Sequence, residues 1–245
     1  MKINQRQITI LKALEKEVFI SVETLSKRLF ASPSSIRRDL AGLESRNLVH
    51  RTHGGVTLFN PTDRVASFSR RLNINVQGKQ AVAKKASAFL QDGMSVFLDG
   101  STTVRYLLPY IATCEKITLF TNNLETASSA ILEGIETHCT GGKAFNSSPV
   151  LVGPDTEKFI KNLQVDAFFF SAQYLNDMGL ITDSSQEETY IRNVMLKHAN
   201  KKYFLCDSEK VGQTALYTLT DITSIDACIL EKEWKALKSN GNIVF

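Results

Sequence analysis

The spacing of apolar residues predicts a helix over residues 5–16, because its apolar side chains fall mainly on one face of a 3.6-residue period. A second helix is expected after Ser21, a good N-cap residue, since apolar residues recur at helical spacing through Leu29. Ser32 can cap a third helix with Pro33 at its first position, where a missing N–H costs nothing. The chain is therefore expected to begin with three helices joined by short turns.

The third helix buries one apolar stripe, formed by Ile36, Leu40 and Leu43. Four polar residues are left largely on its other faces, toward solvent or a ligand: Ser34, Ser35, Arg37 and Arg38. Beyond Asn47, two strand-like runs flank Gly54-Gly55, and paired glycines allow a tight hairpin turn with positive φ. The order of helix, helix, turn, helix and hairpin predicts a winged helix-turn-helix over residues 1–59.

Small side chains at the start of the third helix would let it enter a DNA major groove closely. Ser34 and Ser35 could hydrogen-bond to base edges or phosphates, and Arg37 and Arg38 could reach phosphates or a guanine edge. Two hairpin residues could touch the DNA backbone or the minor groove: Arg51 and His53. The alternative is a three-helix bundle used only for protein contacts, because arginines are common on helix faces.

Charge is unevenly distributed along the chain. Residues 1–85 carry 16 Lys and Arg and 6 Asp and Glu, a net charge of +10, whereas residues 86–245 carry 13 and 19, a net charge of −6. A small basic module can bind a polyanion, and nucleic acid is the commonest polyanion in the cytoplasm. A solvated basic surface without a partner is the alternative interpretation.

Residues 60–79 open with Asn-Pro and carry several basic residues, which predicts an exposed linker between two domains. From residue 80 onward, strand-like and helix-like runs alternate. Strands are expected at residues 95–99, 117–122, 135–142, 166–172, 203–207 and 227–230, and helices at residues 102–108, 124–132 and 186–199. This alternation predicts an α/β domain over residues 80–245, with a mostly parallel sheet covered by helices on both faces.

Polar turns follow four of the expected elements, at residues 99–103, 121–123, 141–143 and 207–210. In such sheets ligands bind outside the carboxyl ends of the strands. The first turn combines a glycine with three hydroxyl groups that precede or open a helix, and free N–H groups at a helix start favour a phosphate. Taken singly, each turn is equally explained as an N-cap or a surface turn.

Several motifs resemble known proteins. The segment from residue 21 to residue 56, which includes IRRDL and HGGV, resembles the N-terminal domain of the DeoR family of bacterial transcriptional regulators. The resemblance implies that Ser34, Ser35, Arg37 and Arg38 lie on the recognition helix. Ser35 stands where family members often carry Thr.

The motifs FLDGSTT, FTNN, TGG and CDSEK resemble the C-terminal effector domain of the same family. That domain is similar in fold to ribose-5-phosphate isomerase and to CoA-transferase-type domains. The resemblance implies a phosphorylated sugar or related metabolite as ligand, bound by seven residues: Asp99, Gly100, Ser101, Thr102, Thr103, Asn122 and Lys210. The chain departs from the family in its Asp-Gly-Ser order, in Arg192, where Lys is common, and in Glu209, where Ser is common. Gln173 and Asn176 are expected where the sugar would be read.

Sequence motifs for other chemistry are missing. There is no Gly-x-Ser-x-Gly, His-Glu-x-x-His or Walker loop, and the four cysteines are far apart, so we expect no catalytic residues, no metal and no cofactor. The N-terminus does not read as a signal peptide, and no apolar run of 18 residues exists, so we expect no membrane partner and a cytoplasmic location.

The resemblance favours a DNA-binding regulator, with repression of a carbohydrate uptake or catabolism operon as the expected outcome. A homo-oligomer, either dimer or tetramer, is expected because helix-turn-helix proteins read two half-sites of double-stranded DNA by symmetry. The alternative is an enzyme, a sugar-phosphate isomerase or transferase with an added N-terminal domain. In that alternative the basic wing and the third helix would have no role.

Overall fold

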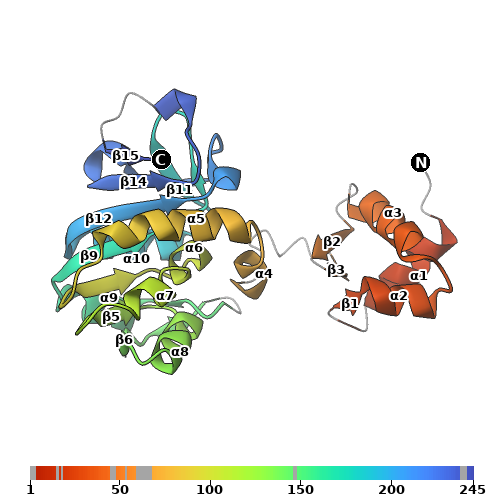
Figure 1. Ribbon diagram of the computed structural model, residues 1–245, viewed down its shortest axis with the longest axis horizontal. Coiled ribbons are helices and arrows are strands. Elements are labelled where there is room, and N and C mark those ends of the chain that lie inside the picture. The colour runs from red at the N-terminus through yellow and green to blue at the C-terminus, as the bar shows by residue number, and fades with distance from the viewer. Residues whose placement is uncertain are drawn as a thin grey trace. The chain divides into compact units, whose positions relative to one another are not determined.

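The computed structural model describes residues 4–14, 17, 19–44, 48–52, 54–58, 68–145, 148–237 and 242–245. The chain divides into two compact units, residues 1–73 and residues 74–245. Figure 1 shows the elements of both units along the chain.

The N-terminal unit contains a winged helix-turn-helix. Its helices are α1 (Gln5–Leu14), α2 (Val22–Arg28) and α3 (Pro33–Glu44), and α4 (Phe68–Leu72) follows later in the chain. Three short strands form an antiparallel sheet in the order β1-β3-β2: β1 (Ile20–Ser21), β2 (Val49–Thr52) and β3 (Gly55–Leu58). The expected caps are confirmed, because Ser21 accepts the N–H of Thr24 and Ser32 accepts the N–H of Ser35 at 3.3 Å.

The turn of the wing depends on its two glycines. Gly54 has a φ of +88°, which favours glycine. Gly55 lies so close to its neighbours that an added Cβ would be 2.3 Å from the Phe19 ring and 2.7 Å from the Ile20 carbonyl oxygen. Only glycine fits both positions without local rearrangement.

A buried carboxylate ties α1 to α3. Asp39 is 5% exposed, and its side chain accepts hydrogen bonds from Arg6 and, at 3.0 Å, from Asn4. The amide of Gln7 also donates to the Asp39 carbonyl oxygen at 3.2 Å. These bonds, together with an apolar cluster that includes Ile10, orient α3 within the unit.

The C-terminal unit contains a seven-stranded parallel sheet in the order β15-β14-β12-β9-β4-β5-β6. Its strands are β4 (Ser95–Leu98), β5 (Thr118–Thr121), β6 (Glu136–Cys139), β9 (Val165–Phe170), β12 (Ala199–Cys206), β14 (Ala227–Leu230) and β15 (Ile243–Val244). The helices are α5 (Val76–Ala86), α6 (Thr102–Arg105), α7 (Leu108–Ile111), α8 (Leu124–Leu132), α9 (Pro154–Lys161) and α10 (Gln186–Lys197).

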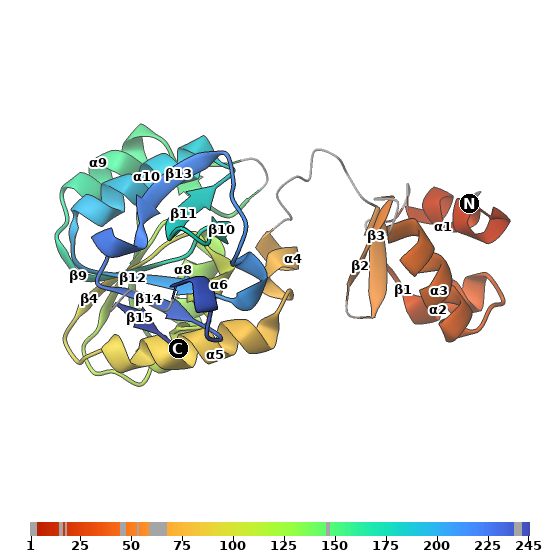
Figure 2. The same ribbon diagram turned by 90° about the horizontal axis from the view of Figure 1, so that it is seen from above.

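Helices cover both faces of this sheet, as Figure 2 shows with α9 and α10 on one side and α5 on the other. In β9, Phe168 and Phe170 point into the core shared with α9 and α10, whereas Ala167 and Phe169 point into the core shared with α5, α6, α7 and α8. The period of two in a strand explains this division. The expected α/β fold with a parallel sheet is confirmed.

Two smaller sheets complete the unit. One is antiparallel, in the order β10-β11-β13, with β10 (Tyr174–Leu175), β11 (Leu180–Asp183) and β13 (Tyr217–Asp221). The other pairs β7 (Lys143–Ala144) with β8 (Leu151–Val152). Single 3-10 turns lie at Ser87–Phe89, Ser208–Lys210, Ile222–Ser224 and Lys235–Leu237.

Two of the expected boundaries differ in the structure, which also contains elements that the sequence did not predict, including α9 and the β10-β11-β13 sheet. The helix expected over residues 102–108 ends at Arg105 and a second begins at Leu108, because Pro109 would clash with the Arg105 carbonyl in a continuous helix and has no N–H to donate to it. The linker was expected to extend to residue 79, whereas α5 begins at Val76 and its Lys79 is buried. The buried side of α5 makes this stretch part of the C-terminal unit.

Replacing Phe169, which is fully buried, by Ala should lower the free energy of unfolding of the C-terminal unit by about 3–5 kcal/mol, through lost burial and the cavity left behind. Urea denaturation can follow this unit alone, because the single tryptophan, Trp234, belongs to it. The control is Leu132→Ala, at a side chain that is 85% exposed, for which the change should stay within about 0.5 kcal/mol. Equal unfolding midpoints for both variants would contradict this packing.

Candidate functional site

The residues expected to read DNA lie on the solvent side of α3. Ser34, Arg37 and Arg38 are exposed, Ser35 is half-buried, and Ile36 on the opposite side is fully buried. No ion pair within the described part of the chain engages Arg37 or Arg38. Their charges are therefore free to meet a polyanion.

The hydroxyl groups at the start of α3 already interact with one another. The Ser32 hydroxyl lies 3.0 Å from that of Ser34 and 2.9 Å from that of Ser35. Each hydroxyl can both donate and accept, so the group retains capacity for a further acceptor or donor. A phosphate or a base edge would match that capacity.

The wing residues have different outcomes. The Arg51 Nε donates to Glu44 at 2.7 Å, and the Arg51 backbone N–H donates to the other oxygen of the same carboxylate at 3.0 Å. This bond fixes Arg51 beside the end of α3 and offsets part of its charge. His53 lies outside the described residues. Both assignments to a DNA contact stay predictions.

A second cluster lies where four neighbouring strands end. The strands β12, β9, β4 and β5 are adjacent and parallel, so their carboxyl ends share one edge of the sheet. The segment from Asp99 to Thr103 follows β4, Asn122 follows β5, and Lys210 lies in the turn after β12. The fold therefore brings the seven expected ligand residues to the same edge.

Lys210 connects three of these strand ends. Its ammonium group donates to the Thr103 hydroxyl at 3.1 Å, to the Ser171 hydroxyl at 2.8 Å and to the Ala172 carbonyl oxygen at 3.1 Å. The side chain is 21% exposed, so the cation still reaches solvent. Ser171 was not foreseen from the sequence, because only the sheet order places the end of β9 beside that of β4.

The turns after β4 and β5 are held to one another. The Asn123 amide donates to the Gly100 carbonyl oxygen at 3.2 Å, and the Asn122 amide donates to the Leu151 carbonyl oxygen at 2.9 Å. An added Cβ at Gly100 would lie 2.6 Å from Val150, so this close approach requires glycine. Ser101 caps α6 by accepting the N–H of Val104.

The helix at this edge is shorter than expected. Since α6 spans only Thr102–Arg105, it is a single turn, and the partial positive charge of its start is correspondingly small. Thr102 and Thr103 are both buried, and their N–H groups open the helix without a partner inside it. An anion at this edge would depend on Lys210 more than on the helix.

Arg192 forms a buried ion cluster behind the same edge. Its Nε donates to Asp99 at 2.6 Å, one Nη to Asp183 at 3.0 Å and the other Nη to Glu188 at 2.9 Å. Burial alone would lower the pKa of the guanidinium, but the three carboxylates outweigh burial and hold this pKa above its usual range. A Lys at this position has no comparable planar set of donors.

The cluster changes the expected part of Asp99. Asp99 is fully buried; one of its oxygens accepts from Arg192, and the other accepts from the Ser101 N–H at 3.0 Å. In the structure it therefore orders the turn from Asp99 to Thr103. Its direct contact with a ligand remains a prediction. The spacing of Glu188 and Arg192, four residues apart on one helix, is the sequence signal for part of this cluster.

Three side-chain oxygens at this edge are buried and have no hydrogen-bond partner within the described residues. They belong to Asn122 after β5, Gln173 after β9 and Asp207 after β12. All three can only accept, and a buried acceptor without a donor costs free energy. With strands about 4.8 Å apart, they span on the order of 14 Å, so a ligand with several donors suits them.

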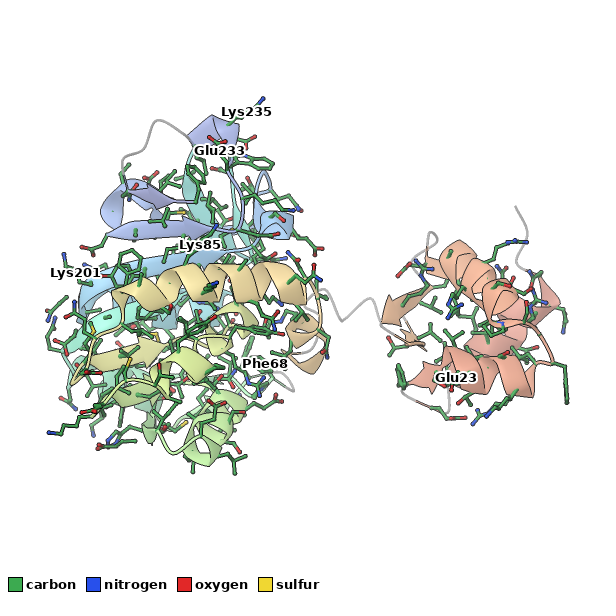
Figure 3. All side chains as sticks on the ribbon, viewed as in Figure 1. Glu23, Phe68, Lys85, Lys201, Glu233 and Lys235 are labelled. Atoms are coloured by element: carbon green, nitrogen blue, oxygen red, sulfur yellow. The ribbon has the colours of Figure 1, made fainter. Side chains whose placement is uncertain are left out.

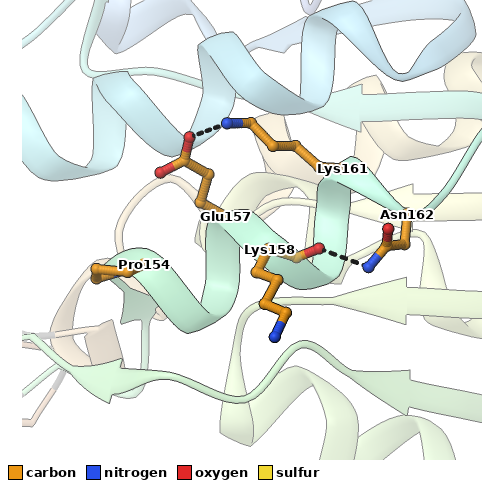
Figure 4. A pocket seen from close by; sticks show the side chains of 5 residues that line it. All are labelled: Pro154, Glu157, Lys158, Lys161 and Asn162. Atoms are coloured by element: carbon orange, nitrogen blue, oxygen red, sulfur yellow. Dashed lines mark hydrogen bonds and ion pairs between the residues drawn. The ribbon is translucent and has the colours of Figure 1, made fainter.

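A hollow of about 400 Å³ lies along α9, lined by Pro154, Glu157, Lys158, Lys161 and Asn162 (Figure 4). The Lys161 ammonium is paired with Glu157 one helical turn away, and the Asn162 amide donates to the Lys158 carbonyl oxygen at 3.1 Å. None of the seven residues expected to bind a ligand lines it. The hollow is therefore separate from the cluster of expected residues at the strand ends.

Two further features were searched for. Among the residues that the structure describes, no group of three or more His, Cys, Asp or Glu side chains is arranged to hold a metal ion. In the same part of the chain, no helix has the length and apolar character needed to cross a bilayer.

Family models match both units of the chain. Residues 6–62 match the DeoR-like helix-turn-helix domain, and residues 74–232 match the DeoR C terminal sensor domain.

Similar curated proteins are named as regulators. The HTH-type transcriptional regulator GolR of Listeria innocua is 29% identical over 94% of this chain and 91% of its own. The HTH-type transcriptional repressor GlcR of Bacillus subtilis is 28% identical over 93% and 88%, and the L-fucose operon activator of Haemophilus influenzae is 28% identical over 94% and 92%.

Among solved structures, ribose 5-phosphate isomerase A from Methanocaldococcus jannaschii aligns with 56% of this chain and 55% of its own, with 16% sequence identity and a TM-score of 0.43. The agreement is too distant to support a conclusion about activity.

Replacing Arg192 by Met should destabilise the C-terminal unit by about 3–5 kcal/mol, because three buried carboxylates lose the cation that they share. Urea denaturation followed by Trp234 fluorescence measures this change. Lys197→Met is the matched control, since it removes an exposed positive charge from the same helix and should cost less than about 0.5 kcal/mol. Similar losses in the two variants would contradict the ion cluster.

Proposed function

Because the chain belongs to the DeoR family of transcriptional regulators, we propose that α3 and the wing bind operator DNA and that a phosphorylated sugar or related metabolite at the strand ends controls this binding. The observation that carries the ligand half of the proposal is the Lys210 ammonium, which joins the ends of β4, β9 and β12. The DNA half depends on the exposed, unpaired arginines of α3.

The DNA half is supported by charge and shape. Residues 1–73, the N-terminal unit, carry 13 Lys and Arg and 6 Asp and Glu, a net charge of +7, and Arg37 and Arg38 are exposed on α3. Small hydroxyl side chains precede them on the same helix, so the backbone could approach a major groove closely. A phosphate contact would set the register, whereas an arginine bound to a guanine edge would supply sequence preference.

The ligand half is supported by the chemistry of the strand ends. Lys210 offers a cation to a phosphate, and the Thr103 and Ser171 hydroxyl groups around it can reorient to donate to phosphate oxygens. Asn122, Gln173 and Asp207 each carry a buried oxygen that receives no hydrogen bond among the described residues, and a sugar hydroxyl group that reaches one of these oxygens would donate to it. A compound with one anionic end and several hydroxyl groups matches both requirements.

Repression of a carbohydrate uptake or catabolism operon is the outcome that we propose. Similar proteins include one named as a repressor and one named as an activator. A dimer or tetramer would place two α3 helices on successive half-sites about 34 Å apart. The sequence alternative of an isomerase or transferase is set aside, because the family is one of regulators.

Replacing Arg38 by Ala should weaken binding to DNA from the region upstream of the gene by about 1–3 kcal/mol if the guanidinium contacts a base edge. Fluorescence anisotropy at two salt concentrations measures the change. Lys12→Ala serves as control, since it removes an exposed charge on α1, outside the helix-turn-helix pair. If Arg38→Ala binds this DNA as tightly as the parent, then Arg38 does not lie in the interface.

Replacing Lys210 by Met should leave DNA affinity within about twofold of the parent and abolish release by any sugar phosphate that releases the parent, because the anion loses its countercharge. Thermal shift measures ligand binding, since a ligand specific to the folded state raises the melting temperature. The control is Lys158→Met, an exposed lysine that lines the α9 hollow. Loss of the response in the control alone would move the effector to that hollow.

A further inference from the structure

The chain enters the C-terminal unit through an unusual residue. Asn75 is the second residue of that unit and the N-cap of α5, with φ 45° and ψ 51°. This left-handed conformation is unfavourable for most residues other than glycine, although Asn tolerates it better than most. The chain that precedes Asn75 comes from the DNA-binding unit. The conformation of Asn75 sets the direction from which this chain enters α5.

The Asn75 amide uses its polar atoms to join three segments. Its oxygen accepts the N–H of Gly78 at 3.3 Å, which caps α5. Its nitrogen donates to Asp207 Oδ1 at 3.2 Å and to Glu231 Oε2 at 3.2 Å. The residues that receive these donors lie 132 and 156 positions later in the chain.

The hydrogen bonds that Asn75 makes with α5, Asp207 and Glu231 form a junction, and Glu231 also binds the turn after β12. Its Oε2 also accepts the backbone N–H and the hydroxyl of Ser208, at 2.9 and 2.6 Å. Burial raises the pKa of Glu231, but these hydrogen bonds outweigh burial and lower it to about 2, so the carboxylate is charged at neutral pH. Lys85, labelled in Figure 3, fixes the same segment to α5 by donating to the carbonyl oxygens of Leu230 and Glu231.

The junction is closely packed. A Cβ added at Gly78 would lie 2.4 Å from the Asn75 nitrogen and 2.5 Å from Glu231 Oε2. Little space is left for Asn75 to change its rotamer while its acceptors keep their places. A movement of the Asp207 side chain would therefore displace the Asn75 side chain or break the hydrogen bond between them.

Asp207 connects the junction to the candidate effector site. Its Oδ1 accepts from Asn75 and, at 3.3 Å, from the Glu209 N–H, while its Oδ2 receives no hydrogen bond from the part of the chain that the structure describes and lies 4.0 Å from the Lys210 ammonium. Asp207 and Lys210 belong to one turn after β12. A ligand that draws Lys210 toward an anion, or donates to the free oxygen of Asp207, would act on a carboxylate that also holds Asn75.

We infer that Asn75 is a positioning residue through which occupancy of the strand-end site changes the course of the chain toward the DNA-binding unit. The inference rests on the function proposed above. In the structure, Asp207 and Glu231 accept from the Asn75 amide while Asn75 is in the left-handed conformation. A ligand that competes for Asp207 removes one of these bonds and favours a different backbone direction. Such a ligand shifts DNA affinity because it binds the two arrangements unequally.

The test compares two substitutions at this position. Asn75→Asp keeps the shape, the tolerance for a left-handed backbone and the oxygen that caps α5, but replaces the donor by an oxygen facing two carboxylates. Asn75→Gly keeps the backbone freedom and removes the whole amide. Gln77→Ala is the matched control, because Gln77 is exposed on the same helix.

The probes are glucose 6-phosphate, fructose 6-phosphate and fructose 1-phosphate, and the full-length protein is used throughout. Three quantities are measured: the melting temperature with each compound, the DNA affinity in the absence of any compound, and the ratio of the DNA affinity without a compound to that with the compound. We consider a compound that lowers the DNA affinity of the parent at least tenfold. For this compound, the ligand affinity derived from the thermal shift should stay within a factor of two of the parent in both Asn75 variants. Their affinity ratios should fall below about two, while Gln77→Ala keeps the parent ratio.

The possible outcomes separate this inference from the function on which it rests. Parental affinity ratios in both Asn75 variants would overturn the inference and leave the proposed function intact. A ratio lost in Asn75→Asp but kept in Asn75→Gly would also overturn it, because introduced repulsion would then be the cause. A parent that binds the DNA but is neither stabilised nor released by these compounds contradicts the proposed function itself, and the inference with it. If Asn75→Asp unfolds at the assay temperature, Asn75→Gly alone decides.

Discussion

The guanidinium of Arg192 is buried inside the C-terminal unit, and each of its three nitrogens meets a different carboxylate. Because a buried charge without a partner costs several kcal/mol, the segments that carry Asp99, Asp183 and Glu188 are constrained to stay together. One of these segments is the turn after β4, which supplies most of the expected ligand residues. The strand-end edge is thus ordered from behind, by a charge cluster that a ligand need not touch.

In front of that cluster the edge is polar and incompletely satisfied. Lys210 donates hydrogen bonds to three oxygens, while one oxygen each on Asn122, Gln173 and Asp207 receives no hydrogen bond among the described residues. A rigid support is suited to binding, because little conformational entropy is lost when a ligand arrives. The same turn that carries Lys210 reaches Asn75, so the binding edge and the start of the unit share one hydrogen-bond network.

Local signals in the sequence were sufficient for much of the fold. The caps of α2 and α3 and the glycine turn of the wing depend on neighbouring residues, and the apolar run of β9 required a strand covered on both faces. The break between α6 and α7 also had a local cause, Pro109, which the apolar pattern around it obscured. Sheet order then placed the polar turns on one edge, as parallel strands require.

Contacts between distant segments could not be read in this way. Asp99 lies 93 residues from Arg192, and Asn75 lies 132 residues from Asp207, so only the complete fold brings these pairs together. The sequence suggested that Asp99 meets a ligand, whereas in the structure Asp99 accepts hydrogen bonds from Arg192 and from the Ser101 N–H. Arg51 likewise has an internal partner, Glu44, that its position on the wing did not reveal.

The three unsatisfied acceptors belong to three separate turns, each following a different strand. Under the proposed function, a substitution in one turn would alter one point of ligand recognition while the sheet, the Arg192 cluster and α3 keep their residues. New chemical selectivity could therefore arise by single changes at the rim of an unchanged framework. Duplicated genes that share this framework could diverge toward different nutrients while retaining the same mode of DNA contact.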